Sequence, residues 1–372
     1  MSREGILVPT TATPNQSDHI RTLDGLRAVA ILCVIVCHVF ADNHKVVALG
    51  HMGVLIFFAL SGYLITTRLV MEYQSNGHIS LRNFYIRRAF RILPPSLAYL
   101  GILSILSALG IVACSPQVIR SAIFFYTNYI NVGKGWYAGH FWSLSVEEHF
   151  YLIWPCLLIG FGVCTGWRIA FALVLAIFVW RIADFHLHIL ARALHDPFLQ
   201  WYGYRTDLIA DTLLWGCCLA FVKLKAGRIS STAIAACSAT LLALLCQDTR
   251  LPFLPHNISL LTPIEHLLPA ILIGAVVACP SAPIGQVLEL EPMRLIGKWS
   301  YSLYIWQQLF LWGPDGPRMP AAIGICAAFV CAYLSYRFIE QPFIRIGRRV
   351  TMATRRPQSG SRSELSDSSA RE

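Results

Sequence analysis

The amino-acid sequence predicts an all-α fold: a polytopic bundle of about ten transmembrane helices, with both chain termini in the cytoplasm. Hydrophobic residues make up 56% of the 372 residues, charged residues make up 13%, and the mean hydropathy is +0.56. A soluble domain carries about 25% charged residues, so this chain lacks the polar surface that a water-soluble fold needs. Its apolar residues also form long runs, which cross a bilayer as helices because backbone N–H and C=O groups must be bonded internally there.

The apolar runs place expected spans along nearly the whole chain. They form a membrane domain at residues 19–349, preceded by a cytoplasmic segment at 1–18. Residues 350–372 are rich in Ser and Arg, which predicts a disordered cytoplasmic tail. Residues 74–95 are expected to form a basic inner loop. The spans are expected at 24–42, 51–71, 93–113, 146–165, 168–188, 206–222, 229–247, 263–280, 298–313 and 319–339.

The distribution of Lys and Arg sets the expected orientation. The formal net charge is +10. If the N-terminus lies inside, most Lys and Arg between the spans fall on the cytoplasmic side, where such residues are retained. Membrane topology therefore explains the basic charge, and we expect the lipid bilayer, not nucleic acid, as the partner.

The cysteines and the N-terminus show none of the usual signals of a metal site or a cleavable signal peptide. None of the 12 cysteines forms a Cys-x-x-Cys pair, and most lie in apolar runs, which is typical of small core residues. We expect no metal site. The first twenty residues are polar, so no cleavable signal peptide is expected, and the first span is expected to direct its own insertion.

The first span contains Arg27 and His38, eleven residues apart. Eleven helical steps make three turns plus about 20°, so both side chains lie on one face, about 16 Å apart along the axis. Ionisable groups are costly inside a membrane and are functional candidates there. Asp42, one turn further on, could orient the imidazole. The alternatives are a hydrogen-bonded core histidine and an arginine that reaches the interface.

The basic segment after the second span contains Arg87, Arg88 and Arg91 within about one helical turn. Guanidinium groups match phosphate oxygens in a bidentate manner, which indicates a site for a phosphorylated cytoplasmic donor. The alternative is an anchor on anionic lipid. Small residues in the second span, among them Gly53, Ser61 and Gly62, are typical of close helix packing.

Two further segments place polar groups in apolar surroundings. Trp142 and Ser143 precede Glu147 and Glu148, and the two carboxylates stand at the start of a hydrophobic span. Desolvated carboxylates suit acid–base chemistry. The start of a helix at the membrane interface explains the two glutamates equally well. The ninth span carries hydroxyl, amide and aromatic groups suited to binding a sugar or lining a pore. The groups singled out in that span include Ser300, Tyr301 and Gln307.

Taken together and in order, these motifs resemble the acyltransferase-3 family of bacterial membrane O-acyltransferases, over roughly residues 19–349. The resemblance implies about ten spans in the bacterial cytoplasmic (inner) membrane. It also implies acyl-CoA, commonly acetyl-CoA, as co-substrate with no tightly bound cofactor, and a hydroxyl acceptor on a carbohydrate. The matching residues are Asp24, Gly25, Arg27 and His38; Phe57, Phe58, Ser61 and Gly62; Arg88 and Arg91; Trp142, Ser143, Glu147, Glu148, Phe150 and Tyr151; Ser300, Tyr301 and Tyr304; and Glu340 and Pro342.

The resemblance also implies roles. The catalytic group comprises His38, Arg27 and Glu147, with Glu147 orienting or polarising His38 or the acceptor. The sequence departs from the family pattern at Gln307, where many members have His, and at His149, where the pattern has Gln. Donor binding is assigned to Arg87, Arg88 and Arg91, and acceptor binding to Trp142, Ser143, Glu148, Tyr301 and Gln307.

The leading hypothesis is an O-acyltransferase in which neutral His38 accepts the proton of the acceptor hydroxyl. A second route, through a transient acyl-imidazole on His38, is also compatible with the sequence. No soluble domain is expected after the tenth span, so an acyl-relay partner would be a separate chain. The alternatives are a proton-coupled transporter or flippase of a glycan or lipid, built on the same ionisable groups, and a non-catalytic scaffold.

Overall fold

The computed structural model describes residues 21–40, 44–130, 135–195, 204–247, 261–311 and 319–353, and every regular element in these ranges is helical. Six helical stretches are long and apolar enough to cross a membrane, and two shorter apolar helices accompany them. The chain is therefore a polytopic helical membrane protein. The six stretches are Arg21–Val39, Ala48–Asn76, Leu81–Ala108, Val163–Leu187, Arg228–Cys246 and Ala321–Met352, and the shorter helices are Asp211–Ala220 and Thr262–Ala278.

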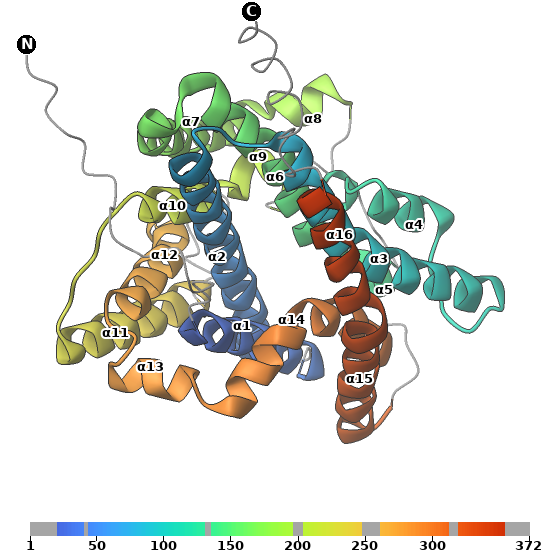
Figure 1. The fold of residues 1–372 in the computed structure, drawn as a ribbon. Helices are drawn as coiled ribbons and strands as arrows, with labels where there is room; N and C mark the ends of the chain where they lie inside the picture. Colours follow the sequence, from blue (N-terminus) through green and yellow to red (C-terminus); the bar gives the residue numbers. More distant parts are fainter. Residues whose placement is uncertain are drawn as a thin grey trace, which may run out of the picture.

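Figure 1 shows the arrangement of the helices in space. One turn of π-helix, Tyr336–Glu340, joins the last two without a break. The helices are α1 (Arg21–Val39), α2 (His44–Asn76), α3 (Leu81–Ala108), α4 (Pro116–Ile123), α5 (Trp136–Gly139), α6 (Phe141–Phe161), α7 (Gly166–Leu187), α8 (Ile189–Ala193), α9 (Thr206–Ile209), α10 (Asp211–Ala220), α11 (Arg228–Gln247), α12 (Thr262–Ala278), α13 (Pro283–Leu288), α14 (Glu291–Phe310), α15 (Ala321–Ser335) and α16 (Gln341–Ala353).

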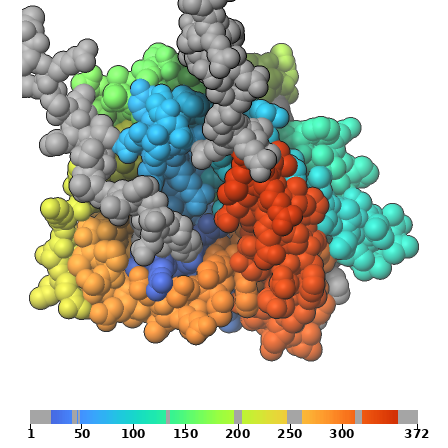
Figure 2. All heavy atoms as spheres, viewed as in Figure 1, coloured from blue at the N-terminus to red at the C-terminus, as the bar shows by residue number. Residues whose placement is uncertain are grey.

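Helix α2 runs through the middle of the bundle. It packs against α1, α10, α11 and α12, and also touches α6. Figure 1 shows α10–α12 on one side of α2 and α3, α4 and α16 on the other, and the space-filling view shows the surface of α2 between those of α12 and α16 (Figure 2). Outer helices such as α7 present large apolar side chains, for example Leu175 and Val179, on the outside of the bundle. A hydrocarbon environment suits such a surface.

Glycines let the central helices approach one another closely, as predicted for the second span. A Cβ on Gly62 of α2 would lie 1.9 Å from the carbonyl oxygen of Leu213 in α10. A Cβ on Gly297 of α14 would lie 1.8 Å from the carbonyl oxygen of Asp24 in α1. These contacts leave no room for a side chain, so α1 is held directly against α14 and α2 against α10.

The prediction of a basic inner loop at residues 74–95 is wrong. Helix α2 continues to Asn76 and α3 begins at Leu81, so only a four-residue turn separates them. Ser80 caps α3, with its side chain accepting a hydrogen bond from the backbone N–H of Asn83. The three arginines of this segment consequently lie on a regular helix, which determines which of them share a face. The predicted segment 1–18 lies outside the described residues, as does the tail beyond 353, whereas residues 350–353 continue α16 instead of beginning a disordered tail.

Replacement of Gly62 by alanine should destabilise the bundle. The added methyl group would overlap the α10 backbone, which cannot yield as a flexible side chain would, at a cost of about 1–3 kcal/mol. The measurement is the thermal unfolding midpoint of detergent-purified protein. Gly101→Ala in α3 is the matched control, because its Cβ would meet no atom within 4 Å and Ala favours helix. Equal midpoints for the two variants would contradict the proposed close contact.

Candidate active site

The side chains of Arg27 and His38 both face α14. Arg27 Nε donates a hydrogen bond to Ser300 Oγ at 3.1 Å, and His38 Nδ1 lies 2.6 Å from Gln307 Oε1. Ser300 and Gln307 are seven residues apart on α14, which is about two turns, so they also share a face. The spacing of the two α1 residues therefore predicted their common face correctly, and both side chains are turned into the bundle.

A cavity opens beside this contact, between α1, α2, α3, α6 and α14. Its empty volume, counted together with the open space at its mouth, is about 840 Å³. Four arginines and one carboxylate line it together with Ser, Tyr and apolar side chains. The charged lining residues are Arg27, Arg68, Arg88, Arg91 and Glu147.

The cavity brings together part of the predicted set. Its lining includes six of the eleven residues to which the sequence assigned catalytic or binding roles, drawn from four separate motifs, but not the other five. The six are Arg27, Arg88, Arg91, Ser143, Glu147 and Tyr301, and the five that lie outside the lining are His38, Arg87, Trp142, Glu148 and Gln307.

Arg87 is oriented differently from its neighbours on α3. Its Nη2 lies 3.1 Å from Glu72 Oε2 of α2, and its side chain is 36% exposed. Arg88 instead stacks over the ring of Tyr151, with its guanidinium carbon 4.6 Å from the ring centre. Because successive residues on a helix point about 100° apart, only Arg88 and Arg91 face the cavity, and the sequence-based grouping of Arg87 with them does not fit the structure.

The remaining members of the predicted set lie around the cavity. Trp142 stacks on Tyr204 with ring centres 4.3 Å apart, and it meets Phe58 edge-on. Glu148 follows Glu147 on α6, within electrostatic reach of Arg88. These residues support the cavity wall or lie beside it.

Glu147 of α6 is hydrogen-bonded to α2. Ser61 Oγ donates to Glu147 Oε1 at 2.6 Å, and the Tyr151 hydroxyl donates to Ser61 Oγ at 3.2 Å. Gln307, not Glu147, is the hydrogen-bond partner of His38 in the described residues. The expectation that Glu147 orients His38 therefore does not fit, because α6 presents Glu147 to α2, whereas α14 faces His38. Asp42, the other residue expected to orient His38, lies outside the described residues.

The partner of His38 determines which ring nitrogen can act as a base. An amide oxygen can only accept, so the proton of the neutral ring resides on Nδ1 and donates to Gln307 Oε1. The lone pair is then on Nε2, on the other side of the ring. Gln307 is fully buried, and its Nε2 has no hydrogen-bond partner in the described part of the chain, so the orientation of the amide rests on the contact of its oxygen with His38.

A second histidine, which the sequence analysis did not single out, lies near His38. His140 is buried, its Nδ1 hydrogen-bonds Gln308 Oε1, and its backbone carbonyl accepts from the Tyr304 hydroxyl at 3.0 Å. Tyr304 also pairs with Ser143 Oγ at 2.5 Å and lines the cavity. Because Tyr304 precedes Gln307 by about one turn on α14, the cavity reaches within roughly 5 Å of the level of His38 along the helix axis.

Sequence reasoning also missed Arg68. It lies in the second apolar run, where an isolated ionisable residue is costly and hence conspicuous, so the signal was present. Ser61 was interpreted only as a small packing residue, whereas its hydroxyl holds Glu147.

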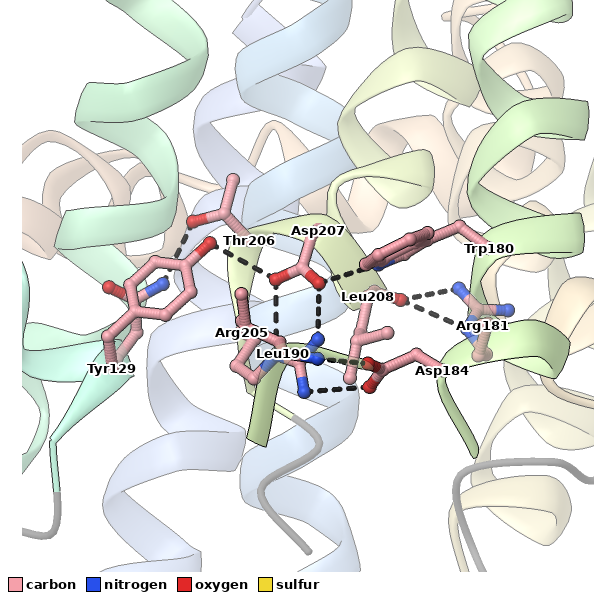
Figure 3. A network of polar contacts seen from close by, with 10 residues as sticks. Tyr129, Trp180, Arg181, Asp184, Leu190, Arg205, Thr206, Asp207 and Leu208 are labelled. Atoms are coloured by element: carbon pink, nitrogen blue, oxygen red, sulfur yellow. Dashed lines mark hydrogen bonds and ion pairs between the residues drawn. The ribbon is translucent and has the colours of Figure 1, made fainter. Parts of the chain in front are cut away.

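Other buried arginines lie in a separate polar network between α7 and α9 (Figure 3). Arg205 Nη1 is 2.8 Å from Asp184 Oδ2, and its Nη2 is 2.5 Å from Asp207 Oδ2. Arg181 pairs with Asp211 at 2.8 Å and donates to the carbonyl oxygen of Leu208. In this network each guanidinium has a carboxylate partner, as buried charges require, and its role is to tie the helix ends together.

One group of described residues has metal-ligand chemistry. The ligand atoms of His51, Glu265 and His266 lie within 4.8 Å of one another. His51 Nε2 is 3.2 Å from Glu265 Oε1, and His266 Nδ1 is 2.7 Å from Asp211 Oδ1. Cys246 also donates to Glu265. Hydrogen bonds account for this arrangement without a cation.

Comparison with known proteins agrees with the geometry. A family model described as an acyltransferase domain matches residues 20–337. The chain is 31% identical to the peptidoglycan O-acetyltransferase OatA of Listeria monocytogenes, over 88% of this chain and 56% of that protein. It is also 31% identical to YrhL of Bacillus subtilis, whose provisional name is peptidoglycan O-acetyltransferase, over 89% of this chain and 56% of that protein.

The chain thus spans a little more than half the length of these curated relatives, 56% in each case. No solved structure matched the chain. The match to the family model extends from before α1 into the π-helical turn after α15, so it includes every helix that lines the cavity. The chain therefore belongs to the acyltransferase-3 family.

Proposed function

We propose that this protein is a membrane O-acetyltransferase that transfers an acetyl group from acetyl-CoA to a hydroxyl of a glycan. The observation that carries the proposal is the pair of contacts Arg27–Ser300 and His38–Gln307, beside a cavity rich in arginine, in a chain of this family. The relatives named for peptidoglycan O-acetylation support a cell-wall glycan as the acceptor.

The arginines of the cavity suit an anionic donor. Arg88 and Arg91, with Arg27 deeper in the bundle, would hold the phosphates of acyl-CoA through charge-assisted hydrogen bonds. The arm of the donor would then extend through the cavity toward Tyr304 and His38. Such a donor is a co-substrate that enters and leaves, and the proposal requires no tightly bound cofactor.

The chemical step follows from the tautomer of His38. Its Nε2 accepts the proton of the acceptor hydroxyl while the hydroxyl oxygen bonds to the thioester carbon. The carbon–sulfur bond breaks, and the thiolate of coenzyme A takes the proton back from the imidazolium. In the variant with an acyl-imidazole, Nε2 itself attacks the thioester carbon and coenzyme A leaves as the thiolate; the acceptor hydroxyl then attacks the acetyl carbon, Nε2 leaves, and the hydroxyl proton passes to the thiolate. Both routes require the lone pair on Nε2, and Glu147, held by Ser61, is assigned to the acceptor hydroxyl.

We also propose the finer topology: about ten spans, both termini in the cytoplasm, and residence in the bacterial cytoplasmic membrane. The shorter apolar helices α10 and α12, together with α6 and α14, would complete the six longer spans. The excess of Lys and Arg at the inner ends supports this orientation, which turns Arg68 and the N-terminal end of α3 toward the cytoplasm, where acyl-CoA is found.

Replacement of His38 by alanine tests the function. Membranes containing the protein are incubated with radiolabelled acetyl-CoA and a cell-wall glycan, and label in the glycan is counted. His38→Ala should reduce transfer to background because no other group supplies the base, whereas His78→Ala, in an exposed turn, should leave it unchanged. Undiminished transfer by folded His38→Ala protein would refute the mechanism, and glycan flux without any acetyl transfer would favour the transporter.

Variants of Gln307 test the tautomer. Gln307→Leu removes the acceptor for Nδ1–H, so Nε2 is no longer reliably unprotonated, and kcat should fall by about 10–100-fold. Gln307→Glu keeps an acceptor and should retain more activity. Its pH optimum should lie higher than that of the wild type, because a carboxylate stabilises the protonated ring and the free base then requires a higher pH. Equal kcat and pH profiles for the wild type and both variants would show that Gln307 does not orient His38.

Neighbouring arginines on α3 provide a matched pair for donor binding. Arg91→Met removes a cavity cation and should raise the KM for acetyl-CoA by about 10-fold or more, since hydrogen bonds to charged groups contribute about 1.5–3 kcal/mol. Arg87→Met, four residues earlier and paired with Glu72, should leave the KM nearly unchanged. The measurement is steady-state kinetics in proteoliposomes, and a larger effect for Arg87 than for Arg91 would contradict the assignment.

A further inference from the structure

The arginines of this protein fall into two groups that differ in how their charge is balanced. Arg87, Arg181 and Arg205 each lie within 4.0 Å of a carboxylate. Within the described ranges, Arg68, Arg88 and Arg91 form no such ion pair, although they line one cavity.

Arg68 is the member of this group that is surrounded by like charge. The charged groups that act most strongly on it are Arg91, Arg88, Arg27 and Arg348 of α16, whereas Glu147 and Glu340 offset part of the charge of Arg88 and Arg91. Concentrating like charges beside a hydrocarbon phase is unfavourable, and a bound polyanion relieves it. The cavity therefore has the electrostatics of a site that is completed by a ligand with several negative charges.

Arg68 occupies a distinct place in this group. It is exposed, whereas Arg27, Arg88 and Arg91 are half-buried, so it lies at the mouth of the cavity. Along α2 the lining runs from Val54 to Arg68, fourteen residues or about 21 Å. Arg68 is thus the lining residue of α2 that lies furthest along that helix from the end near His38.

We infer that Arg68 binds the 3′-phosphate of the ribose in the acyl-CoA donor and makes the enzyme selective for coenzyme A over thioesters that lack this phosphate. The inference rests on the proposed function. An elongated cavity with its candidate base near one end and its outermost cation at the other matches a molecule with a thioester at one end and a phosphorylated ribose at the other.

The charges support the same assignment. Four guanidinium groups and one carboxylate line the cavity, and Glu148 and Glu340 lie within electrostatic reach of Arg88 and Arg91. The charged groups that act most strongly on Arg68 are all positive. The diphosphate of coenzyme A carries about two negative charges, and a phosphate monoester adds about 1.5 to 2 more. Arg68, the most exposed of the four guanidinium groups, is the cation available to this additional phosphate.

The test uses purified protein in proteoliposomes of phosphatidylethanolamine and phosphatidylglycerol, with acetyl-CoA or 3′-dephospho-acetyl-CoA as donor. Wild type should favour acetyl-CoA by about tenfold to a hundredfold in kcat/KM, as expected for one charge-assisted phosphate contact. Arg68→Met should lose this preference through a higher KM for acetyl-CoA, with kcat/KM for the dephospho donor unchanged. Arg82→Met, an exposed arginine of α3 outside the cavity lining, should keep the wild-type preference.

Three outcomes would overturn the inference. The first is that wild type uses both donors equally. The second is that Arg68→Met weakens both equally. The third is that the effect of Arg68→Met disappears in phosphatidylcholine vesicles, which would make Arg68 an anchor on anionic lipid. In each case the acyltransferase function would stand. Turnover of neither donor by wild type would instead refute the proposed function, and this inference with it.

Discussion

Positive charge held beside lipid without a carboxylate partner is the constraint on which the rest of this structure depends. The buried arginines between α7 and α9 are neutralised within the protein: Arg205 lies between Asp184 and Asp207. In the described residues, the cavity arginines Arg68, Arg88 and Arg91 have no carboxylate within 4.0 Å. A membrane protein retains such charges only where water or a ligand reaches them. The proposed anionic donor would supply the missing negative charge in the cavity beside α1.

The backbone contacts of α1 position the helices beside this cavity. Gly297 allows α14 to lie directly on α1 at Asp24, and this contact fixes the relative height of the two helices. Arg27, one turn along α1, then meets Ser300, one turn along α14. Three turns further along α1, His38 meets Gln307. The separation of the arginine from the histidine is thus set by rigid helices in backbone contact, not by loops, so a donor of fixed length would find its two ends at constant positions.

Helical periodicity explains what could be predicted. The common face of Arg27 and His38 follows from eleven residues at 100° each, and the small residues of the second span indicated close packing. Contacts between distant segments could not be derived in this way. That Gln307 rather than Glu147 meets His38 depends on which helix packs against α1, and one chain's sequence does not reveal that. Arg87 was grouped with Arg88 and Arg91 because the three fall within about one helical turn, whereas on α3 the side chain of Arg87 is directed to Glu72 of α2. Arg68 could have been found from the cost of an ionisable group in an apolar run.

The amide at position 307 also restricts the route of the proton. An imidazole there could accept a proton from His38 and release it elsewhere, but a carboxamide does not titrate and can only hold the Nδ1–H. His140 is hydrogen-bonded at Nδ1 to Gln308, and no hydrogen bond joins it to His38 in the described residues. In the proposed step, the proton that His38 Nε2 would receive from an acceptor hydroxyl returns from the same nitrogen to the departing thiolate. A base that returns its proton to the leaving group within one turnover needs no connection to bulk water. This fits a histidine that is placed near the inner limit of a cavity whose mouth, marked by the exposed Arg68, lies at the other end.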